Sequence, residues 1–262
     1  MRGYHRGMCY DDDARPPLPP IRGAALDAVE LTLTSADGTR VAAYAARAEA
    51  ATGAGMVILP DVRGLHPFFE ELTLRFAEAG VDAIAIDYFS RTAGTGRRGA
   101  DFDYQAHVPL TRHETLNADA SAAAAYLRSP EGGAVKRLYT VGFCFGGRLS
   151  YLQAASGIDP AGVIGFYGWP VGANRAGLPA PADEAPRFTC PVLELWGGAD
   201  QGIGPDVVAT FNEALDHAGV THTSVVYPGA PHSFFDRTSS EHADASADAW
   251  RQVLNFMGVP AA

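Results

Sequence analysis

Short apolar segments alternate with amphipathic segments along most of this chain, and no other feature constrains its fold as strongly. Several of the apolar segments are hydrophobic at nearly every position, as expected for strands that are covered on both faces. They occupy residues 56–60, 81–88, 137–143, 162–168, 191–197 and 221–228. Between them, apolar residues recur every three or four positions, which predicts helices that pack on a core. We therefore predict a mostly parallel sheet with helices on both faces.

The N-terminal part of the chain departs from this rhythm. Residues 30–34 and 40–46 alternate between apolar and polar around an Ala-Asp-Gly-Thr turn, which predicts a β-hairpin. The first residues are polar, acidic and then rich in proline. We therefore expect a proline-rich arm over residues 1–22 and a single α/β domain over residues 23–262.

Charge and cysteine content exclude several classes of function. The chain has 30 acidic and 20 basic residues, with a net charge of -10, whereas binding of nucleic acid or of an anionic membrane requires a basic face. The run from Asp11 to Asp13 lacks a further ligand at fixed spacing, so it predicts solvated acids and no metal site. Three cysteines form no disulfide framework, which favours a reducing, cytoplasmic compartment. The sequence contains no long apolar span and no signal-peptide pattern at its N-terminus.

The apolar segment at residues 137–143 runs into Gly142-Phe143-Cys144-Phe145-Gly146-Gly147, and a helical pattern follows. A nucleophile on a strained strand-to-helix turn needs small residues two positions away, and the helix N-terminus there stabilises negative charge. We therefore predict Cys144 as the nucleophile and the N–H of Phe145 as an oxyanion donor. The alternatives are a small core cysteine and a nucleotide loop, for which the usual glycine spacing and lysine are absent.

A nucleophile of this kind needs a base and an acid that orients the base. Asp200 follows the fifth apolar segment, and His232 follows the sixth. Both are thus expected at the same edge of the sheet as Cys144, where catalytic groups of such folds gather. The other histidines lie in the arm, before the elbow, at the opposite end of a strand or at the start of the last helix. Asp206 is a rival acid, but it falls in the first turn of a predicted helix.

With Cys144, Asp200 and His232 in this order, the chain resembles the dienelactone hydrolase family of α/β-hydrolases. The resemblance rests on the elbow, on Gly198-Ala199-Asp200 and on His232-Ser233-Phe234, and extends from about residue 29 to the end. It implies a compact α/β-hydrolase domain without a large cap. It also implies hydrolysis of enol lactones such as dienelactone, with no cofactor.

The resemblance implies four further roles, two of them near the thiol and two for arginines. Asp61 matches a carboxylate that contacts the resting thiol, and the N–H of Val62 matches a second oxyanion donor. Arg91 matches an arginine that holds the substrate carboxylate. The position of another such arginine is Asp236 in this chain, with Arg237 one residue further. The alternatives are a loop acid for Asp61 and surface positions for Arg91 and Arg237.

Trp169 follows an apolar segment and Phe234 lies beside His232, so we predict that both form an apolar pocket wall, with core packing as the alternative. A thiolate is expelled from a tetrahedral adduct more easily than an alkoxide, so the ester must carry a good leaving group. The predicted partner is a small activated ester or lactone, anionic if the arginines bind it. Two alternatives stay open, a general carboxylesterase and a catalytically silent binding protein of the same fold.

Overall fold

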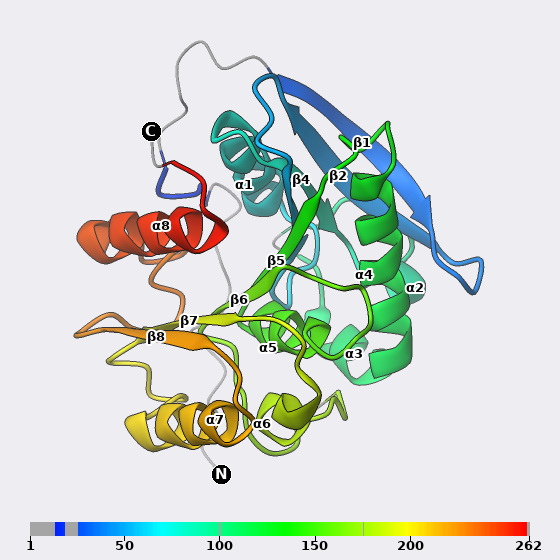
Figure 1. The fold of residues 1–262 in the computed structure, drawn as a ribbon. Helices are drawn as coiled ribbons and strands as arrows, with labels where there is room; N and C mark the ends of the chain where they lie inside the picture. Colours follow the sequence, from blue (N-terminus) through cyan, green and yellow to red (C-terminus); the bar gives the residue numbers. More distant parts are fainter. Residues whose placement is uncertain (1–13, 19–25, 100, 175, 261–262) are drawn as a thin grey trace.

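The computed structural model describes residues 14–18, 26–99, 101–174 and 176–260 (Figure 1). Most of the arm predicted over residues 1–22 lies outside the described residues, so its extent stays a prediction. No helix within the described ranges is long and apolar enough to cross a membrane.

The strands of the described chain form a single sheet in the order β1-β2-β4-β3-β5-β6-β7-β8 (Figure 1). β1 and β2 form the predicted hairpin, and β2 also runs antiparallel to β4. All other neighbouring strands run parallel, which confirms the prediction of a mostly parallel sheet. The strands are β1 Leu26–Thr34, β2 Arg40–Ala48, β3 Ala54–Leu59, β4 Asp82–Ile86, β5 Arg137–Phe143, β6 Gly162–Phe166, β7 Val192–Gly197 and β8 His222–Tyr227.

Helices connect the strands, as the apolar periodicity predicts. The longer ones are α1 Pro67–Glu78, α4 His113–Arg128, α5 Phe145–Gln153, α7 Pro205–His217 and α8 Ala243–Met257. Short helices and turns fill the loops, namely α2 Ser90–Ala93, α3 Tyr104–His107, η1 Val108–Leu110, α6 Pro181–Glu184 and η2 Ala185–Arg187. The described residues contain no separate cap domain.

Successive residues of β3 belong to different cores, which shows how the two faces of the sheet are covered. Met56 and Ile58 belong to the core that includes α1 and α8, whereas Val57 and Leu59 belong to the core that includes α4. Figure 1 shows α1 and α8 on one side of the sheet and α4 on the other. Every residue of β3 is buried, and this two-sided burial accounts for the continuous apolar strands.

The carboxyl ends of the parallel strands carry the predicted site residues. Cys144 follows β5 directly, Asp200 lies three residues beyond the end of β7, and His232 lies five residues beyond the end of β8. Because β5, β6, β7 and β8 are consecutive parallel neighbours, their carboxyl ends bring these residues to one edge of the sheet.

Candidate active site

Cys144 occupies a strained position at the turn from β5 to α5. Its φ of 53° and ψ of -111° lie in a region that residues with a side chain rarely adopt. The Cys144 N–H donates to the carbonyl of Phe166 at 3.0 Å, and the Cys144 carbonyl accepts from the N–H of Gly147 at 3.0 Å. The main chain of Cys144 is therefore held by the neighbouring strand on one side and by its own helix on the other.

The glycines around Cys144 are required by close backbone contacts. A Cβ atom at Gly142 would lie 1.8 Å from the carbonyl oxygen of Gly146. A Cβ atom at Gly146 would lie 2.1 Å from the carbonyl oxygen of Leu59. Main-chain atoms cannot move away as a flexible side chain would, so only glycine fits at these two positions. The sequence pattern around Cys144 thus reflects this packing directly.

Asp200 and His232 are joined by a hydrogen bond. Asp200 Oδ2 lies 2.6 Å from His232 Nδ1, and Asp200 Oδ1 accepts from the N–H groups of Gly202 and Ile203 at 2.8 and 3.2 Å. Burial raises the pKa of Asp200, but the hydrogen bond and charge of His232 outweigh burial and hold this pKa below its usual value. Asp200 is therefore an oriented anion at neutral pH, as a group that orients a base must be.

Cys144 lies close enough to His232 to influence the pKa of His232. Burial lowers the pKa of His232, but the charge of Cys144 and hydrogen bonds to Asp200 and Cys144 outweigh burial and raise this pKa well above its usual value. His232 Nε2 is buried and has no hydrogen-bond partner of regular geometry within the described residues. This arrangement can hold a thiolate beside an imidazolium ion.

The Tyr167 ring packs against the His232 ring, a contact that the sequence analysis did not predict. The Tyr167 and His232 rings lie 4.8 Å apart between centroids, and the Tyr167 hydroxyl donates to Asp236 Oδ2 at 2.7 Å. Tyr167 has a φ of 40° and Ser233 a φ of 63°, so both flanking turns are strained. Tyr167 directly follows β6, and the strand-end placement that points to Asp200 would have found it too.

The two predicted oxyanion donors lie in the two backbone segments next to Cys144. Phe145 begins α5, and Val62 lies in the loop after β3. Among the described residues, neither the Phe145 N–H nor the Val62 N–H has a hydrogen-bond partner. The Tyr88 hydroxyl donates to the carbonyl oxygens of Pro60 and Asp61 and so anchors the loop that carries Val62. Two unused N–H groups are what an oxyanion requires.

Asp61 is paired with Arg63, and no contact between Asp61 and the Cys144 thiol is observed. The Arg63 guanidinium donates to Asp61 from Nε at 3.1 Å to both oxygens and from Nη2 at 3.0 Å to Oδ2. The Arg63 N–H donates to Asp61 Oδ1 at 2.8 Å, and both side chains are buried. The sequence reasoning missed Arg63, although an acid and an arginine two residues apart in one loop are a visible signal for such a pair.

The arginines predicted to hold a substrate carboxylate have other surroundings. Arg91 donates to Asp119 Oδ1 at 2.7 Å and to Thr39 Oγ1 at 2.8 Å, and it pairs with Asp37 at 2.5 Å. Two carboxylates thus balance its charge, and a role of Arg91 in holding a substrate carboxylate stays a prediction. Arg237 is exposed, in agreement with the alternative of a surface position.

The two residues predicted as a pocket wall differ in their environment. Trp169 is 37% exposed, and its carbonyl oxygen accepts from Arg148 Nη1 at 3.2 Å. Phe234 has no exposed surface and packs against Tyr167 and Tyr227. Phe234 is therefore packed in the core next to the His232 turn, in agreement with the alternative of core packing. Trp169 remains a candidate for the pocket rim.

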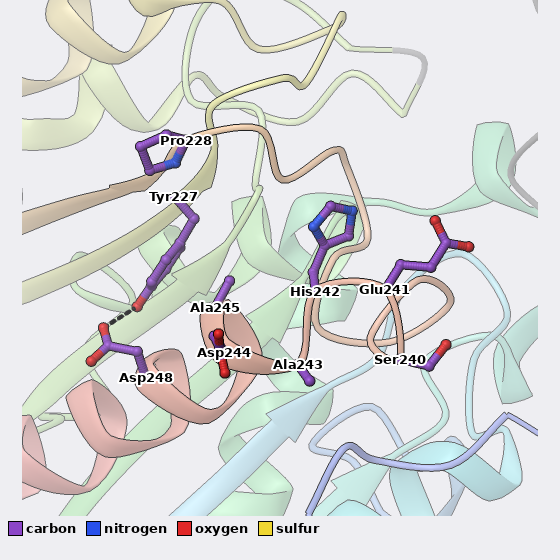
Figure 2. Close-up of a pocket in the computed structure, with 9 residues that line it drawn as sticks. All are labelled: Tyr227, Pro228, Ser240, Glu241, His242, Ala243, Asp244, Ala245 and Asp248. Carbon is purple, nitrogen blue, oxygen red and sulfur yellow. Dashed lines mark hydrogen bonds between the residues drawn. The ribbon is translucent and has the colours of Figure 1, made fainter.

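A cavity of about 590 Å³ lies between the end of β8 and the start of α8 (Figure 2). Figure 2 shows the hydrogen bond from the Tyr227 hydroxyl to Asp248 in this cavity, with His242 and Asp244 on the cavity wall. It is lined by none of the predicted site residues, so we do not assign the reaction to it. The described residues contain no group of three or more His, Cys, Asp or Glu side chains arranged to hold a metal ion.

Comparison with known proteins gives the family of this chain. Residues 41–259 match the family model described as the dienelactone hydrolase family. The chain belongs to this family. A protein of Yersinia pestis named "Putative carboxymethylenebutenolidase" is 30% identical over 240 residues, which span 87% of this chain and 86% of the relative. A protein of the same name from Escherichia coli strain K12 is 31% identical, over 88% of this chain and 87% of the relative.

Solved structures lead to the same family. The "Crystal Structure of Putative Dienelactone Hydrolase from Klebsiella pneumoniae subsp. pneumoniae MGH 78578" is 29% identical, with a TM-score of 0.79. The alignment covers 89% of this chain and 99% of that structure. This dienelactone hydrolase family member is thus an enzyme of the carboxylic ester hydrolase class with an α/β-hydrolase fold. The alternative of a catalytically silent binding protein is not supported.

Proposed function

We propose that the enzyme hydrolyses activated carboxylic esters and enol lactones with Cys144 as nucleophile, His232 as base and Asp200 as the residue that orients the base. The observation that carries the proposal is the 2.6 Å hydrogen bond between Asp200 and His232, beside a cysteine in a strained turn. The raised pKa of His232, which depends in part on the charge of Cys144, supports the pairing of base and nucleophile.

In the acylation step, His232 accepts the thiol proton and the thiolate attacks the carbonyl carbon, so that a C–S bond forms. The N–H groups of Val62 and Phe145 stabilise the resulting oxyanion, each by roughly 3 kcal/mol. Collapse of the adduct breaks the C–O bond and leaves a thioester. His232 returns the proton to the departing oxygen.

In the deacylation step, His232 accepts a proton from water, and the hydroxide attacks the thioester carbonyl. Collapse of this second adduct breaks the C–S bond and releases the carboxylic acid. The proton held by His232 then returns to the Cys144 sulfur. The net reaction is ester plus water to acid plus alcohol, or to the opened hydroxy acid for a lactone.

The thiol nucleophile favours substrates with a good leaving group. The first adduct partitions between expulsion of the thiolate and expulsion of the alcohol oxygen. Enolates and phenolates compete well in this partition, and amines do not. Enol lactones fit this requirement, and a 26% identical protein of Bradyrhizobium is named "Probable 2-oxo-3-(5-oxofuran-2-ylidene)propanoate lactonase".

A second candidate is hydrolysis of simple uncharged esters by the same machinery. The specific observation in its favour is that Arg91 is paired with Asp37 and Asp119 and does not offer a free positive charge. An arginine whose charge is already balanced favours an uncharged acyl group over one that bears a carboxylate.

A cytoplasmic location belongs to the proposal as well. Cys144 and Cys190 are both free thiols. A thiolate nucleophile is readily oxidised, so it stays active best in a compartment that keeps thiols reduced.

The test measures ring opening of dienelactone and hydrolysis of an uncharged aryl ester by the wild type, by Cys144→Ala and by Cys190→Ala. Cys190→Ala is the matched control, since Cys190 is a buried cysteine outside the proposed site. We expect Cys144→Ala to lose at least about 10³-fold in kcat/KM, because the nucleophile is removed, while Cys190→Ala remains active. Retention of esterase activity in Cys144→Ala would refute the mechanism. Turnover of the aryl ester alone would select the second candidate.

A further inference from the structure

The loop between β6 and α6, of which residues 169–174 and 176–180 are described, follows the strand that lies next to β5. Tyr167, just before it, packs on His232. Gly168 lies so close to the turn after Cys144 that a Cβ atom there would be 2.4 Å from the main-chain carbon of Gly147. The loop therefore begins next to the backbone of the Cys144 turn and next to the His232 ring.

Arg148 ties this loop to the helix that begins at the nucleophile. Arg148 lies in the first turn of α5, where its N–H donates to the Cys144 carbonyl at 3.3 Å. Arg148 is 2% exposed, and within the part of the chain that the structure describes its side chain donates to main-chain oxygens of the loop. The contacts are Nε to Pro179 at 3.1 Å, Nη1 to Trp169 at 3.2 Å, and Nη2 to Gly172, Leu178 and Pro179 at 2.7, 2.8 and 2.7 Å.

The guanidinium group binds both ends of the loop at once. Trp169 and Gly172 belong to the outgoing part, whereas Leu178 and Pro179 belong to the returning part. Asp183 attracts the charge from α6, but no salt bridge to Arg148 is found among the described residues. Burying a cation beside neutral acceptors costs free energy unless its hydrogen bonds are satisfied. The N–H groups of the Arg148 guanidinium must therefore be matched closely by the carbonyl oxygens around them. Lysine, with one nitrogen, cannot reproduce this geometry.

We propose that Arg148 is a positioning residue that holds the loop of residues 169–180 beside Cys144 and thereby determines which acyl groups reach the thiol. The half-exposed Trp169, whose carbonyl Arg148 binds directly, is the side chain that this anchoring places at the rim. The inference rests on the proposed function of Cys144. It concerns substrate size and fit, and it assigns Arg148 no contact with the reacting atoms.

The first test compares Arg148→Met and Arg148→Lys with Arg128→Met as the matched control. Arg128 also donates to main-chain carbonyls, those of Ile158 and Asp159, but in the loop at the opposite end of β6. For an ester with a bulky acyl group, we expect Arg148→Met to raise KM by about tenfold while kcat stays within about threefold of wild type. Arg128→Met leaves both parameters unchanged. An unchanged KM in a folded Arg148→Met protein overturns the proposal, and so does a loss confined to kcat.

The second test needs no turnover. Cys144 is labelled with iodoacetamide and with a bulky maleimide, and the rates are read at the Cys144 peptide by mass spectrometry. We expect Arg148→Met to speed labelling by the bulky reagent at least about fivefold, with little change for the small one, and to speed amide exchange in residues 169–180. Equal rates for wild type and variant with both reagents overturn the proposal. If Arg148→Met does not fold, the same labelling experiment is run on Arg148→Lys, which keeps the positive charge but lacks the planar set of guanidinium N–H donors.

The two proposals fail differently. If the wild type shows no Cys144-dependent hydrolysis, the proposed function fails, and the labelling experiment still decides the role of Arg148. If hydrolysis depends on Cys144 but Arg148→Met behaves as wild type in kinetics and labelling, only the inference about Arg148 fails.

Discussion

The hydroxyl of Tyr88 lies 2.7 Å from the main-chain oxygen of Asp61 and also contacts the main-chain oxygen of Pro60. Tyr88 follows β4 and is 2% exposed. The loop it binds belongs to the neighbouring strand β3 and carries the N–H of Val62. One buried hydroxyl thus fixes the loop that supplies a proposed oxyanion donor.

Replacing Tyr88 with phenylalanine is expected to lower kcat more than it raises KM. The loop loses its anchor, and the position of an oxyanion donor matters most in the transition state. The buried carbonyls also lose a donor, so the free energy of unfolding should fall by about 1–3 kcal/mol. Steady-state kinetics and urea unfolding measure the two effects.

Tyr139→Phe is the control. The Tyr139 hydroxyl makes one long contact, 3.4 Å to the main-chain oxygen of Met257, so this substitution should leave kcat unchanged. Equal kcat values in wild type and Tyr88→Phe would contradict the assignment.

Replacing Gly146 with alanine is expected to abolish activity and to destabilise the fold. The new Cβ atom would lie 2.1 Å from the Leu59 oxygen and 2.2 Å from the Pro60 oxygen, so β3 and α5 must separate. We expect a loss of about 3 kcal/mol or more in the free energy of unfolding, typical of overpacking against rigid groups. Gly96→Ala is the control, since nothing lies within 4 Å of a Cβ atom there. Stability of Gly146→Ala equal to that of Gly96→Ala would show that the elbow can relax.

The sequence predicts the sheet and the strand-end positions of Cys144, Asp200 and His232, because these follow from local periodicity and from topology. A central strand that is buried on both faces has apolar residues at nearly every position. The tight turn at the nucleophile requires glycines at fixed spacing. Such features need no knowledge of distant side chains.

The partners of individual charges could not be predicted in this way. Arg91 meets Asp119 on α4 and Asp37 in the first hairpin, segments that only the complete fold brings together. Phe234 sits beside His232 in the sequence, yet its side chain points into the core. Arg148 acts through main-chain carbonyls of a distant loop, for which sequence spacing carries no signal. The position of Tyr167 after β6 is visible in the sequence, but its ring packing on His232 is not.

Arg91→Met is expected to destabilise the protein without changing its preference between charged and uncharged esters. Asp119 has no exposed side-chain surface, so removal of its partner leaves a buried charge and should cost about 3 kcal/mol. Chemical denaturation measures this loss, and Arg97→Met, which breaks an exposed pair with Glu30, should cost less than about 1 kcal/mol. KM values for a matched pair of esters, one with a carboxylate, test the second part. A selective rise in KM for the carboxylate ester would restore Arg91 as a substrate-binding residue.

Cys144→Ala is expected to lower the pKa of His232. Burial already lowers this pKa, and the attraction of the Cys144 charge is a main cause that opposes burial. Without the thiol, His232 should lose its proton at a lower pH than in the wild type. Proton NMR titration of the imidazole measures the shift, and Cys190→Ala should titrate as the wild type does. An identical His232 titration in Cys144→Ala would mean that the two side chains do not interact.

Glu194 should make the enzyme less stable as the pH rises from about 4.5 to about 7. Glu194 lies in the middle of β7 with no exposed surface, and it accepts hydrogen bonds from His222 Nδ1 at 3.0 Å and Trp196 Nε1 at 3.2 Å. Burial raises the pKa of Glu194 to about 7, and attraction to His222 opposes burial only in part. A raised folded-state pKa stabilises the fold fully below the unfolded-state pKa. That stabilisation is lost as the pH rises through the folded-state value.

The expected loss over this window is on the order of 3 kcal/mol in the free energy of unfolding. The glutamine of Glu194→Gln cannot ionise, so the stability of this variant should fall less steeply between pH 4.5 and 7. This difference in slope is expected even if a poorer hydrogen bond with Trp196 makes the variant less stable at pH 4.5. Urea unfolding of both proteins at several pH values gives the two curves. Their difference isolates the Glu194 carboxyl together with its effect on His222, which also contacts Asp216. Parallel curves would show that Glu194 is already ionised in the folded protein at pH 4.5 and that water or His222 compensates its charge.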